Sequence, residues 1–476
     1  MRISTLRNKP YYHWVIFAAV AVGTFMATLD SSIVNVALPT ISETFKVELP
    51  VLQWVVTAYL LTISSLLPTL GRLADMYGRS WIFNYGLLSF AFGSLCCGLS
   101  STVSTLVLSR VIQAIGAAMM MANSMGIITA VFPQKMRGRA LGTMGAVVAA
   151  GSITGPSFGG IIISNWGWPA IFFVNIPIGI IGFFAGLVIL PQDKHLGQES
   201  FDLLGAVLFA AGMISLLLGL SLAEEYGWGS GLILMLLFGA LMLLALFIGH
   251  EIKCPYPMID LTLFRNHIFA AGNAAGLISF IVIFSVNILM PFYLQTILYL
   301  EPRQVGMMLT PFPLVMAFFS PFSGWLSDKV GPMIPTILGL GIGALNVISM
   351  AFLTAESSMV SVAVRLGIMG MAMSIFQAPN NSAVLGSVPR HKLGVAGGIV
   401  ATVRNLGMVL GIAFSVTVFS SRQGAYLASG AGKVPAFMHG FRVAMVMAAG
   451  FCILGAIMSI IRGKGPDETG NAIEES

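Results

Sequence analysis

The chain of 476 residues is too apolar, and carries too few charges, for a water-soluble protein. Its mean hydropathy is +0.91, 57% of its residues are hydrophobic and only 9% are charged, whereas soluble domains carry about 25% charged residues. A helix of about 20 residues crosses the ~30 Å hydrocarbon core of a bilayer. Where apolar residues fall in runs of that length, this composition excludes a soluble enzyme and indicates a polytopic membrane protein.

Fourteen charge-poor apolar runs follow one another along the chain, and each is predicted to be a transmembrane helix. In chain order they cover residues 12–36, 51–72, 81–100, 104–132, 137–163, 167–190, 202–222, 230–250, 267–297, 303–327, 334–354, 359–386, 392–421 and 437–462. The predicted fold class is therefore an all-α polytopic membrane protein with the lipid bilayer as its surroundings.

The Lys and Arg residues are divided unevenly between the two sets of loops. Sixteen of the 24, including Arg462 at the end of the last span, lie in the termini and in the loops on the same side, whereas four (Lys46, Arg303, Arg422 and Lys433) lie in the opposite loops. Cytoplasmic loops carry an excess of Lys and Arg, so both termini are predicted to be cytoplasmic. The net charge of +6 follows from this topology and predicts no nucleic-acid partner.

A loop motif occurs twice and indicates an internal repeat. The loop residues Gly71, Arg72, Asp75, Gly78 and Arg79 are followed 253 residues later by a second copy that keeps Gly324, Asp328 and Gly331. Both copies lie on the same side, as expected for a parallel repeat of two six-helix halves. The predicted organisation is a cytoplasmic N-terminus (1–11), a first bundle (12–190), two additional helices with a cytoplasmic connector (191–266), a second bundle (267–462) and a disordered cytoplasmic tail (463–476). The two additional helices have no charge in their cores and are expected at the periphery.

Several further motifs make the chain resemble the fourteen-span branch of drug:proton antiporters in the major facilitator superfamily. These are residues 29–39 of the first span, the loop 71–79, residues 110–113 of the fourth span, 151–160 of the fifth and 172–179 of the sixth. The resemblance covers nearly the whole chain and implies the major facilitator fold, export rather than uptake, and a bacterial cytoplasmic membrane.

The resemblance also implies roles for two of these motifs. Residues 71–79 and their repeat correspond to the cytoplasmic latch that holds the outward-facing state. The antiporter motif of the fifth span comprises Gly151, Gly155, Pro156, Gly159 and Gly160, and in the family it seals the cavity against leak. Glycines at every fourth residue form a flat helix face, which also serves ordinary helix packing. In the sixth span, Asn175 is interpreted as a residue of helix packing.

Ionisable residues inside the spans are few. Asp30 is the only acid, and the bases are Arg110, Arg365, Arg404 and Arg442. An intramembrane carboxylate is costly unless it is paired or protonated, so small changes of access switch its proton occupancy. We expect Asp30 to bind the transported proton with Arg110 as its counter-ion. The alternative is a structural pair that never titrates.

The other buried arginines have no such acid. Arg365 repeats Arg110, but the position equivalent to Asp30 in the second half is Val282. We expect Arg365 to bond carbonyl oxygens near Pro379 or the side chains of Asn380 and Asn381, or to face the cavity. Arg442 is expected to reach the membrane interface.

The substrate cavity is predicted from polar residues, methionines and the buried arginine in corresponding spans of the two halves. It comprises Asn35, Gln113, Met120, Asn123, Asn287, Arg365, Gln377, Asn380 and Asn381. Adaptable thioethers suit a cavity that accepts many shapes, although methionine is also ordinary membrane filler. A single embedded acid favours monovalent, neutral or anionic cargo over dications.

The function predicted is proton-coupled export of small amphipathic compounds by alternating access, with the proton gradient as the energy source, no cofactor and the monomer as the working unit. The alternative on the same fold is a dedicated exporter of one metabolite, siderophore or lipid-like molecule. A non-transporting receptor or scaffold is disfavoured because it needs no buried titratable pair. No nucleotide-binding loop, metal-ligand spacing or nucleophile–base pair is found, so neither an enzyme nor a metal site is predicted.

Overall fold

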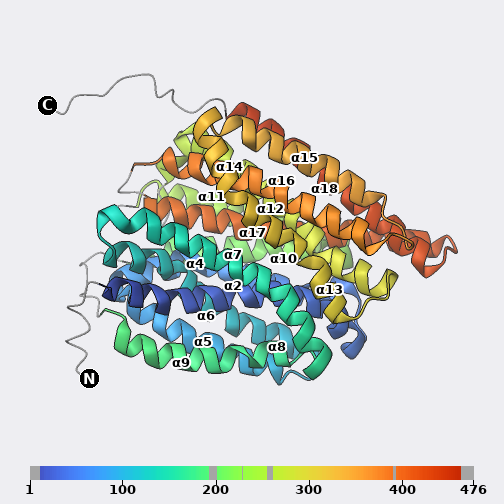
Figure 1. Ribbon diagram of the computed structural model, residues 1–476, viewed down its shortest axis with the longest axis horizontal. Helices are drawn as coiled ribbons and strands as arrows, with labels where there is room; N and C mark the ends of the chain where they lie inside the picture. Colours follow the sequence, from blue (N-terminus) through green and yellow to red (C-terminus); the bar gives the residue numbers. More distant parts are fainter. Residues whose placement is uncertain (1–10, 192–200, 228, 255–260, 390–392, 463–476) are drawn as a thin grey trace.

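The computed structural model describes residues 11–191, 201–227, 229–254, 261–389 and 393–462. In these ranges the chain is helical throughout and contains no strand, as expected for the all-α class. The helices run roughly parallel or antiparallel to one long axis, and the start of the first described helix and the end of the last lie at the same end of the bundle (Figure 1). We call this the terminal end, and the other the opposite end.

The first half is a bundle of helices that pair through extensive side-by-side packing, mainly α2 with α7, α4 with α6, and α5 with α6 and α9. Its helices are α2 (Tyr12–Phe45), α3 (Leu49–Leu52), α4 (Trp54–Tyr77), α5 (Arg79–Gly98), α6 (Val103–Val131), α7 (Gln134–Trp166), α8 (Ala170–Phe173) and α9 (Asn175–Ile189). A capping box at Thr102 and Thr105 defines the start of α6.

The second half repeats this packing, with α12 against α17 and α18, α14 against α16, and α15 against α16 and α18. Its elements are the short 3₁₀ helix η1 (Leu261–Arg265), α12 (His267–Phe292), the π-helical segment η2 (Tyr293–Ile297), α13 (Pro302–Leu309), α14 (Pro311–Val330), α15 (Met333–Ala351), α16 (Met359–Gly386), α17 (Leu393–Ala428) and α18 (Lys433–Ile461).

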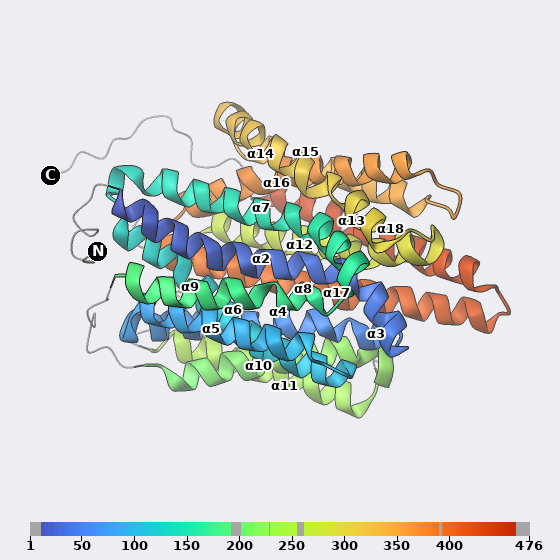
Figure 2. The same cartoon turned by 60° about the horizontal axis from the view of Figure 1, so that its bottom comes forward.

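Two helices between the halves, α10 (Leu203–Tyr226) and α11 (Gly231–Glu251), form a hairpin at one edge (Figure 2). The α10 helix packs against α4 and α17, whereas α11 packs against α10. Large apolar side chains of α11, including Met235, Phe238 and Leu241, are exposed. The hairpin therefore lies at the periphery, as the absence of charge from the cores of its helices predicts, and its outer face suits lipid.

Thirteen helical stretches in the described residues are long and apolar enough to cross a membrane. The helix α7, predicted as a further span, is not among them, although it has 33 residues and packs along α2. Several residues of α7 lie outside those whose side chains the structure describes. The structure thus contains about thirteen to fourteen helices of membrane-spanning length.

The two halves pack tightly against each other at the opposite end. A Cβ at Gly160 of α7 would approach the carbonyl oxygen of Pro302 to 2.5 Å, and one at Gly306 of α13 would overlap the carbonyl oxygen of Pro156. Ser157 is hydrogen-bonded to Thr310, also across the halves. Gly160 of α7 and Gly306 of α13 are therefore needed where α7 meets the second half.

The repeated loop motif forms the same turn in both halves. The α4 helix ends at Tyr77 and α5 begins at Arg79, so Gly78 alone connects them, with φ of 109°. In the second copy α14 ends at Val330, and Gly331 follows with φ of 78°. Only glycine adopts such backbone angles without strain, which explains why this glycine occurs in both copies.

Candidate functional site

Asp30 and Arg110 form an ion pair in the interior of the first half. Asp30 lies near the middle of the 34-residue helix α2, and Arg110 lies in the first third of α6. The Nη1 of Arg110 is 2.5 Å from Oδ2 of Asp30, and both side chains are about 1% exposed or less. The structure thus brings together the two charges that the sequence singled out.

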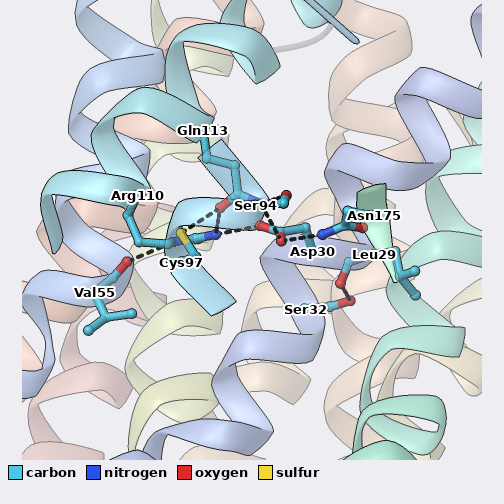
Figure 3. A network of polar contacts seen from close by, with 9 residues as sticks. All are labelled: Leu29, Asp30, Ser32, Val55, Ser94, Cys97, Arg110, Gln113 and Asn175. Atoms are coloured by element: carbon cyan, nitrogen blue, oxygen red, sulfur yellow. Dashed lines mark hydrogen bonds and ion pairs between the residues drawn. The ribbon is translucent and has the colours of Figure 1, made fainter. Parts of the chain in front are cut away.

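Three neutral side chains, from α6 itself and from α5 and α9, complete a polar network around the pair (Figure 3). Gln113, one turn beyond Arg110, accepts a hydrogen bond of 2.6 Å from Arg110 Nη1 and donates one of 2.8 Å to Asp30 Oδ1. Its amide also donates to Ser94 Oγ on α5, at 2.7 Å. Asn175, at the start of α9, donates to Asp30 Oδ1 at 3.0 Å. The carboxylate therefore accepts three hydrogen bonds.

Arg110 has partners that are independent of Asp30. Its Nε donates to the carbonyl oxygen of Val55 on α4 at 3.0 Å, and its guanidinium lies 3.9 Å from the centre of the Tyr59 ring. The ring of Phe172 lies on another side at 5.8 Å. Aromatic faces attract a desolvated cation, so Arg110 stays anchored to α4 when its bond to Asp30 weakens.

This arrangement supports two protonation states of different geometry. With Asp30 ionised, both carboxylate oxygens accept hydrogen bonds and the ion pair ties α2 to α6. A proton on Asp30 removes the negative charge and one acceptor site, which weakens the bonds from Arg110, Gln113 and Asn175 to α2. Loading a proton therefore loosens α2 relative to α6 and α9.

The glycine face of the antiporter motif packs on the helix turn that carries Asp30. A Cβ at Gly151 would overlap Oγ1 of Thr28, and one at Gly155 would overlap Oγ of Ser32. The hydroxyl of Ser32 donates to the carbonyl oxygens of Leu29 and Gly151, at 3.0 and 3.3 Å. The motif thus lies between the Asp30 turn and the second half, because Pro156 and Gly160 of the same helix contact α13.

Asn175 corrects the interpretation of the sixth span. Its position near Pro177 indicated helix packing, whereas its amide binds the carboxylate. The contact could have been suspected from the sequence, because Asn175 lies inside an apolar run and a buried amide needs hydrogen-bond partners.

The second half has no equivalent charge pair. Val282, at the position equivalent to Asp30, is buried among apolar residues. Arg365 donates from Nε to the carbonyl oxygen and hydroxyl of Ser349, at 3.2 Å each, and from Nη1 to Ser361. The expected contacts with Asn380, Asn381 or the Pro379 region are therefore wrong, because serines within one turn or on the adjacent α15 satisfy the guanidinium first.

The structure separates the residues that were predicted to line one substrate cavity. Gln113 belongs to the Asp30 network, Met120 is fully buried between α2 and α5, and Asn123 donates to Met119 within its own helix at 2.7 Å. Asn35 is buried on α2, and Asn287 and Gln377 are half-buried in the second half. The amide nitrogen of Gln377 has no hydrogen-bond partner among the described residues.

Asn380 and Asn381 line a separate cavity at the terminal end of the second half. Its walls come from α12, α16 and α17 and comprise Gly272, Asn273, Gly276, Phe280, Asn380, Asn381, Val384, Val400, Val403 and Arg404. Arg462, counted by sequence among the loop charges, is instead 1% exposed and donates to Asn380 Oδ1 at 2.8 Å and to Thr336 Oγ1 at 3.1 Å. The helix α18 extends to residue 461, which places Arg462 against α15 and α16.

Most of the predicted gating loop is helical. Gly71 and Arg72 lie within α4, and Gly324 lies within α14. Arg79 donates to the carbonyl oxygen of Gly126 on α6 at 3.2 Å. The side chains of Asp75 and Asp328 lie outside the described residues, so their pairing as a latch stays a prediction.

One group of residues could hold a metal ion, although the sequence spacing predicted none. Asp202, His250 and Cys254 place ligand atoms within 4.8 Å of one another at the terminal end of the α10–α11 hairpin. His250 Nε2 is 2.8 Å from Asp202 Oδ1, which also caps α10 through Gly205 N–H at 2.9 Å. Asp202 is 48 residues from His250 and meets it only when the two helices pair, so no local sequence motif contains all three ligands.

Comparison with known proteins identifies the family. The family model described as Major Facilitator Superfamily matches residues 20–202 and 203–412. Two solved transporters share the fold over 96% of this chain: a bacterial homologue of the human lysosomal transporter Spinster in an inward-facing conformation (TM-score 0.70, 18% identity, 97% of that chain) and the POT family transporter PepTSo (TM-score 0.71, 15% identity, 98% of that chain).

Three curated relatives are similar over most of the sequence. The riboflavin transporter RibZ of Clostridioides difficile is 36% identical over 96% of this chain and 99% of its own. The multidrug resistance protein Stp of Mycobacterium tuberculosis is 33% identical over 85% and 75%, and the tetracenomycin C resistance and export protein of Streptomyces glaucescens is 32% identical over 88% and 78%. The chain therefore belongs to the Major Facilitator Superfamily of membrane transporters and is of the type whose relatives are named for multidrug resistance and drug export.

Proposed function

We propose that this protein is a proton-coupled exporter of small amphipathic compounds in a bacterial cytoplasmic membrane, with fourteen spans and both termini in the cytoplasm. The observation that carries the proposal is the buried network of Asp30, Arg110, Gln113 and Asn175. An intramembrane carboxylate is expensive to maintain, and the network lets it exist in two protonation states.

Alternating access supplies the coupling. In the present conformation the halves are packed together at the opposite end, which the proposal assigns to the cell exterior. Asp30 then releases its proton and cargo enters from the cytoplasm at the terminal end. When the exterior side opens, Asp30 can bind a new proton. Protonation weakens the ion pair between Arg110 and Asp30, which holds α2 against α6 only while Asp30 is deprotonated. Proton and cargo thus favour opposite states.

The experiment uses proteoliposomes with an imposed pH gradient and ethidium, a fluorescent monovalent amphiphile, as the test cargo. Wild type should couple ethidium movement to counter-movement of protons, and Asp30→Asn should not. The matched control is Glu43→Gln, which neutralises an exposed acid on the same helix and should retain coupling. Coupled transport by Asp30→Asn at the wild-type rate would refute the proton assignment.

A dedicated transporter of one metabolite is the second candidate, and the similarity to the riboflavin transporter over nearly both full chains favours it. The two candidate functions predict different substrates and different inhibition by competing compounds. A broad exporter of amphiphiles should move ethidium and be inhibited by chemically unrelated amphiphiles, whereas a dedicated transporter should move riboflavin and ignore ethidium. Both compounds fluoresce, so one vesicle assay decides between them.

A further inference from the structure

Arg404 is a half-buried cation to which no described residue offers a hydrogen-bond or ion-pair partner. It lies on α17, its Nε is buried, and neither a hydrogen bond nor an ion pair links its side chain to any residue that the structure describes. A buried N–H donor without an acceptor costs about 1–3 kcal/mol. Arg110 and Arg365, by comparison, are both satisfied by neighbouring groups.

The cavity beside Arg404 has the composition of a site for a polar group. Asn273, Asn380 and Asn381 share its wall with Arg404, and two glycines, Gly272 and Gly276, leave room on the α12 side. Its volume is about 20 Å³, whereas about 10–15 Å³ holds one water molecule. The cavity therefore accepts a single small head group rather than a whole amphiphile.

A second positive charge stands directly behind this wall. Arg462 donates to Asn380 Oδ1 and to Thr336 Oγ1, which are neutral acceptors, and it has no carboxylate partner in the described part of the chain. The bond fixes the Asn380 amide, whose Nδ2 donates to the carbonyl oxygen of Gly272 at 3.0 Å. Two arginines without an acid make this region electropositive.

We propose that the Arg404 cavity binds the carboxylate or phosphate group of an anionic amphiphilic cargo at the terminal end of the second half. A planar guanidinium binds such groups through two parallel hydrogen bonds. The inference rests on the proposed export function and adds compounds with one anionic group to the substrates that the protein accepts. The proton site in the first half and this site in the second half are then separate.

The test measures thermal unfolding of the full-length protein in nanodiscs of phosphatidylcholine, which has no net charge, at constant ionic strength. Benzoate is the probe, benzyl alcohol is its neutral counterpart, and inorganic phosphate is a second anion. A ligand that binds only the folded state raises the apparent Tm in a saturable manner, by about 1–3 °C at ten times Kd. Wild type should respond to benzoate and phosphate and not to benzyl alcohol.

Two variants locate the effect. Arg404→Gln should abolish the benzoate response, whereas Arg442→Gln, which removes an exposed arginine at the opposite end, should retain it. Arg404→Lys keeps the charge without the planar fork and should respond at least fivefold more weakly. An equal response to benzoate and benzyl alcohol in wild type, or an undiminished response in Arg404→Gln, would overturn the proposal, and the wild-type comparison decides even where Arg404→Gln does not fold.

A lipid head group offers the same chemistry as an anionic cargo, so a further arm uses nanodiscs with phosphatidylglycerol. If benzoate still stabilises the protein there, the site is open to cargo. Loss of the response would assign the site to lipid and contradict the cargo proposal. The assay needs no transport, so its result is independent of whether Asp30 couples export to protons.

Discussion

Gln113 and Asp30, 83 residues apart in sequence, are joined by a hydrogen bond of 2.8 Å in which the amide Nε2 donates to the carboxylate Oδ1. The oxygen of the same amide, Oε1, accepts a hydrogen bond of 2.6 Å from Arg110 Nη1. Gln113 is thus hydrogen-bonded to both members of the ion pair and fixes the position of one side chain relative to the other. The first prediction concerns this bridge.

Gln113→Leu should leave Asp30 and Arg110 in place but remove the amide that each of them contacts. Unsatisfied buried polar groups cost about 1–3 kcal/mol each, so the free energy of unfolding should fall by roughly that amount. Ethidium-driven proton movement should fall tenfold or more. Asn165→Leu, which changes an exposed asparagine on α7, is the control, and equal activity of the two variants would argue against a role for the bridge.

Gly155→Ala tests the contact between the antiporter motif and the Asp30 turn. The added Cβ would overlap Oγ of Ser32, and overpacking of a close helix contact costs about 1–3 kcal/mol. The variant should therefore be less stable and should leak protons without cargo. The matched substitution is Gly450→Ala in α18, where nothing lies within 4 Å, and it should be neutral or slightly stabilising. A stable, tight Gly155→Ala protein would contradict the close packing.

Cargo charge provides a third prediction. Asp30 is the only acid in the interior of the spans predicted from the sequence, and in the proposal it carries the proton. Ethidium and propidium share a ring system but carry one and two positive charges. Ethidium should be transported several-fold faster, because no second carboxylate is present to neutralise the extra charge. Preferred transport of propidium would mean that another acid enters the cavity.

The contact between Asp202 and His250 in the α10–α11 hairpin should make the stability of the protein depend on pH. Burial alone would raise the pKa of Asp202, but the hydrogen bonds from Gly205 N–H and from His250, together with the charge of His250, lower it below the ordinary value of 3.8. A lowered pKa contributes stability that is present above the pKa of the unfolded chain, about 3.9, and is lost as the pH falls through the folded value.

Asp202→Ala should therefore reduce the free energy of unfolding at pH 7 by about 1 kcal/mol, as expected for loss of a helix N-cap. The difference from wild type should shrink below about pH 4, where the carboxylate of the wild type also becomes protonated. Asp202→Asn keeps a capping oxygen and should lose less. Thermal unfolding as a function of pH measures all three proteins, and a constant difference across pH would show that the charge of Asp202 is irrelevant.

Helix positions and the ion pair were predictable from the sequence for the same physical reason. In a bilayer every backbone polar group must be hydrogen-bonded within the protein, and each buried charge needs a partner. Apolar runs therefore identify the helices, and the buried acid Asp30 and the buried base Arg110 could be predicted to pair. The repeat of Gly78 and Gly331 was likewise visible, because only glycine tolerates their backbone angles.

The partners of these residues were not predictable, because they come from other helices. Asn175 reaches Asp30 across 145 residues, and Val55 offers Arg110 a carbonyl oxygen, which carries no signal in the sequence. Arg462 was predicted to be a loop charge, whereas in the structure it follows α18 directly and is hydrogen-bonded to Thr336 and Asn380. Side-chain contacts between distant helices depend on how the helices rotate and slide, and a single sequence does not specify that.

The most direct test of the central claim is proton release on cargo binding by purified protein in a lightly buffered solution with a pH indicator. If Asp30 carries the proton, ethidium should release protons from wild type and from Glu43→Gln, and should release none from Asp30→Asn although that variant still binds ethidium. Undiminished proton release by Asp30→Asn would contradict the account.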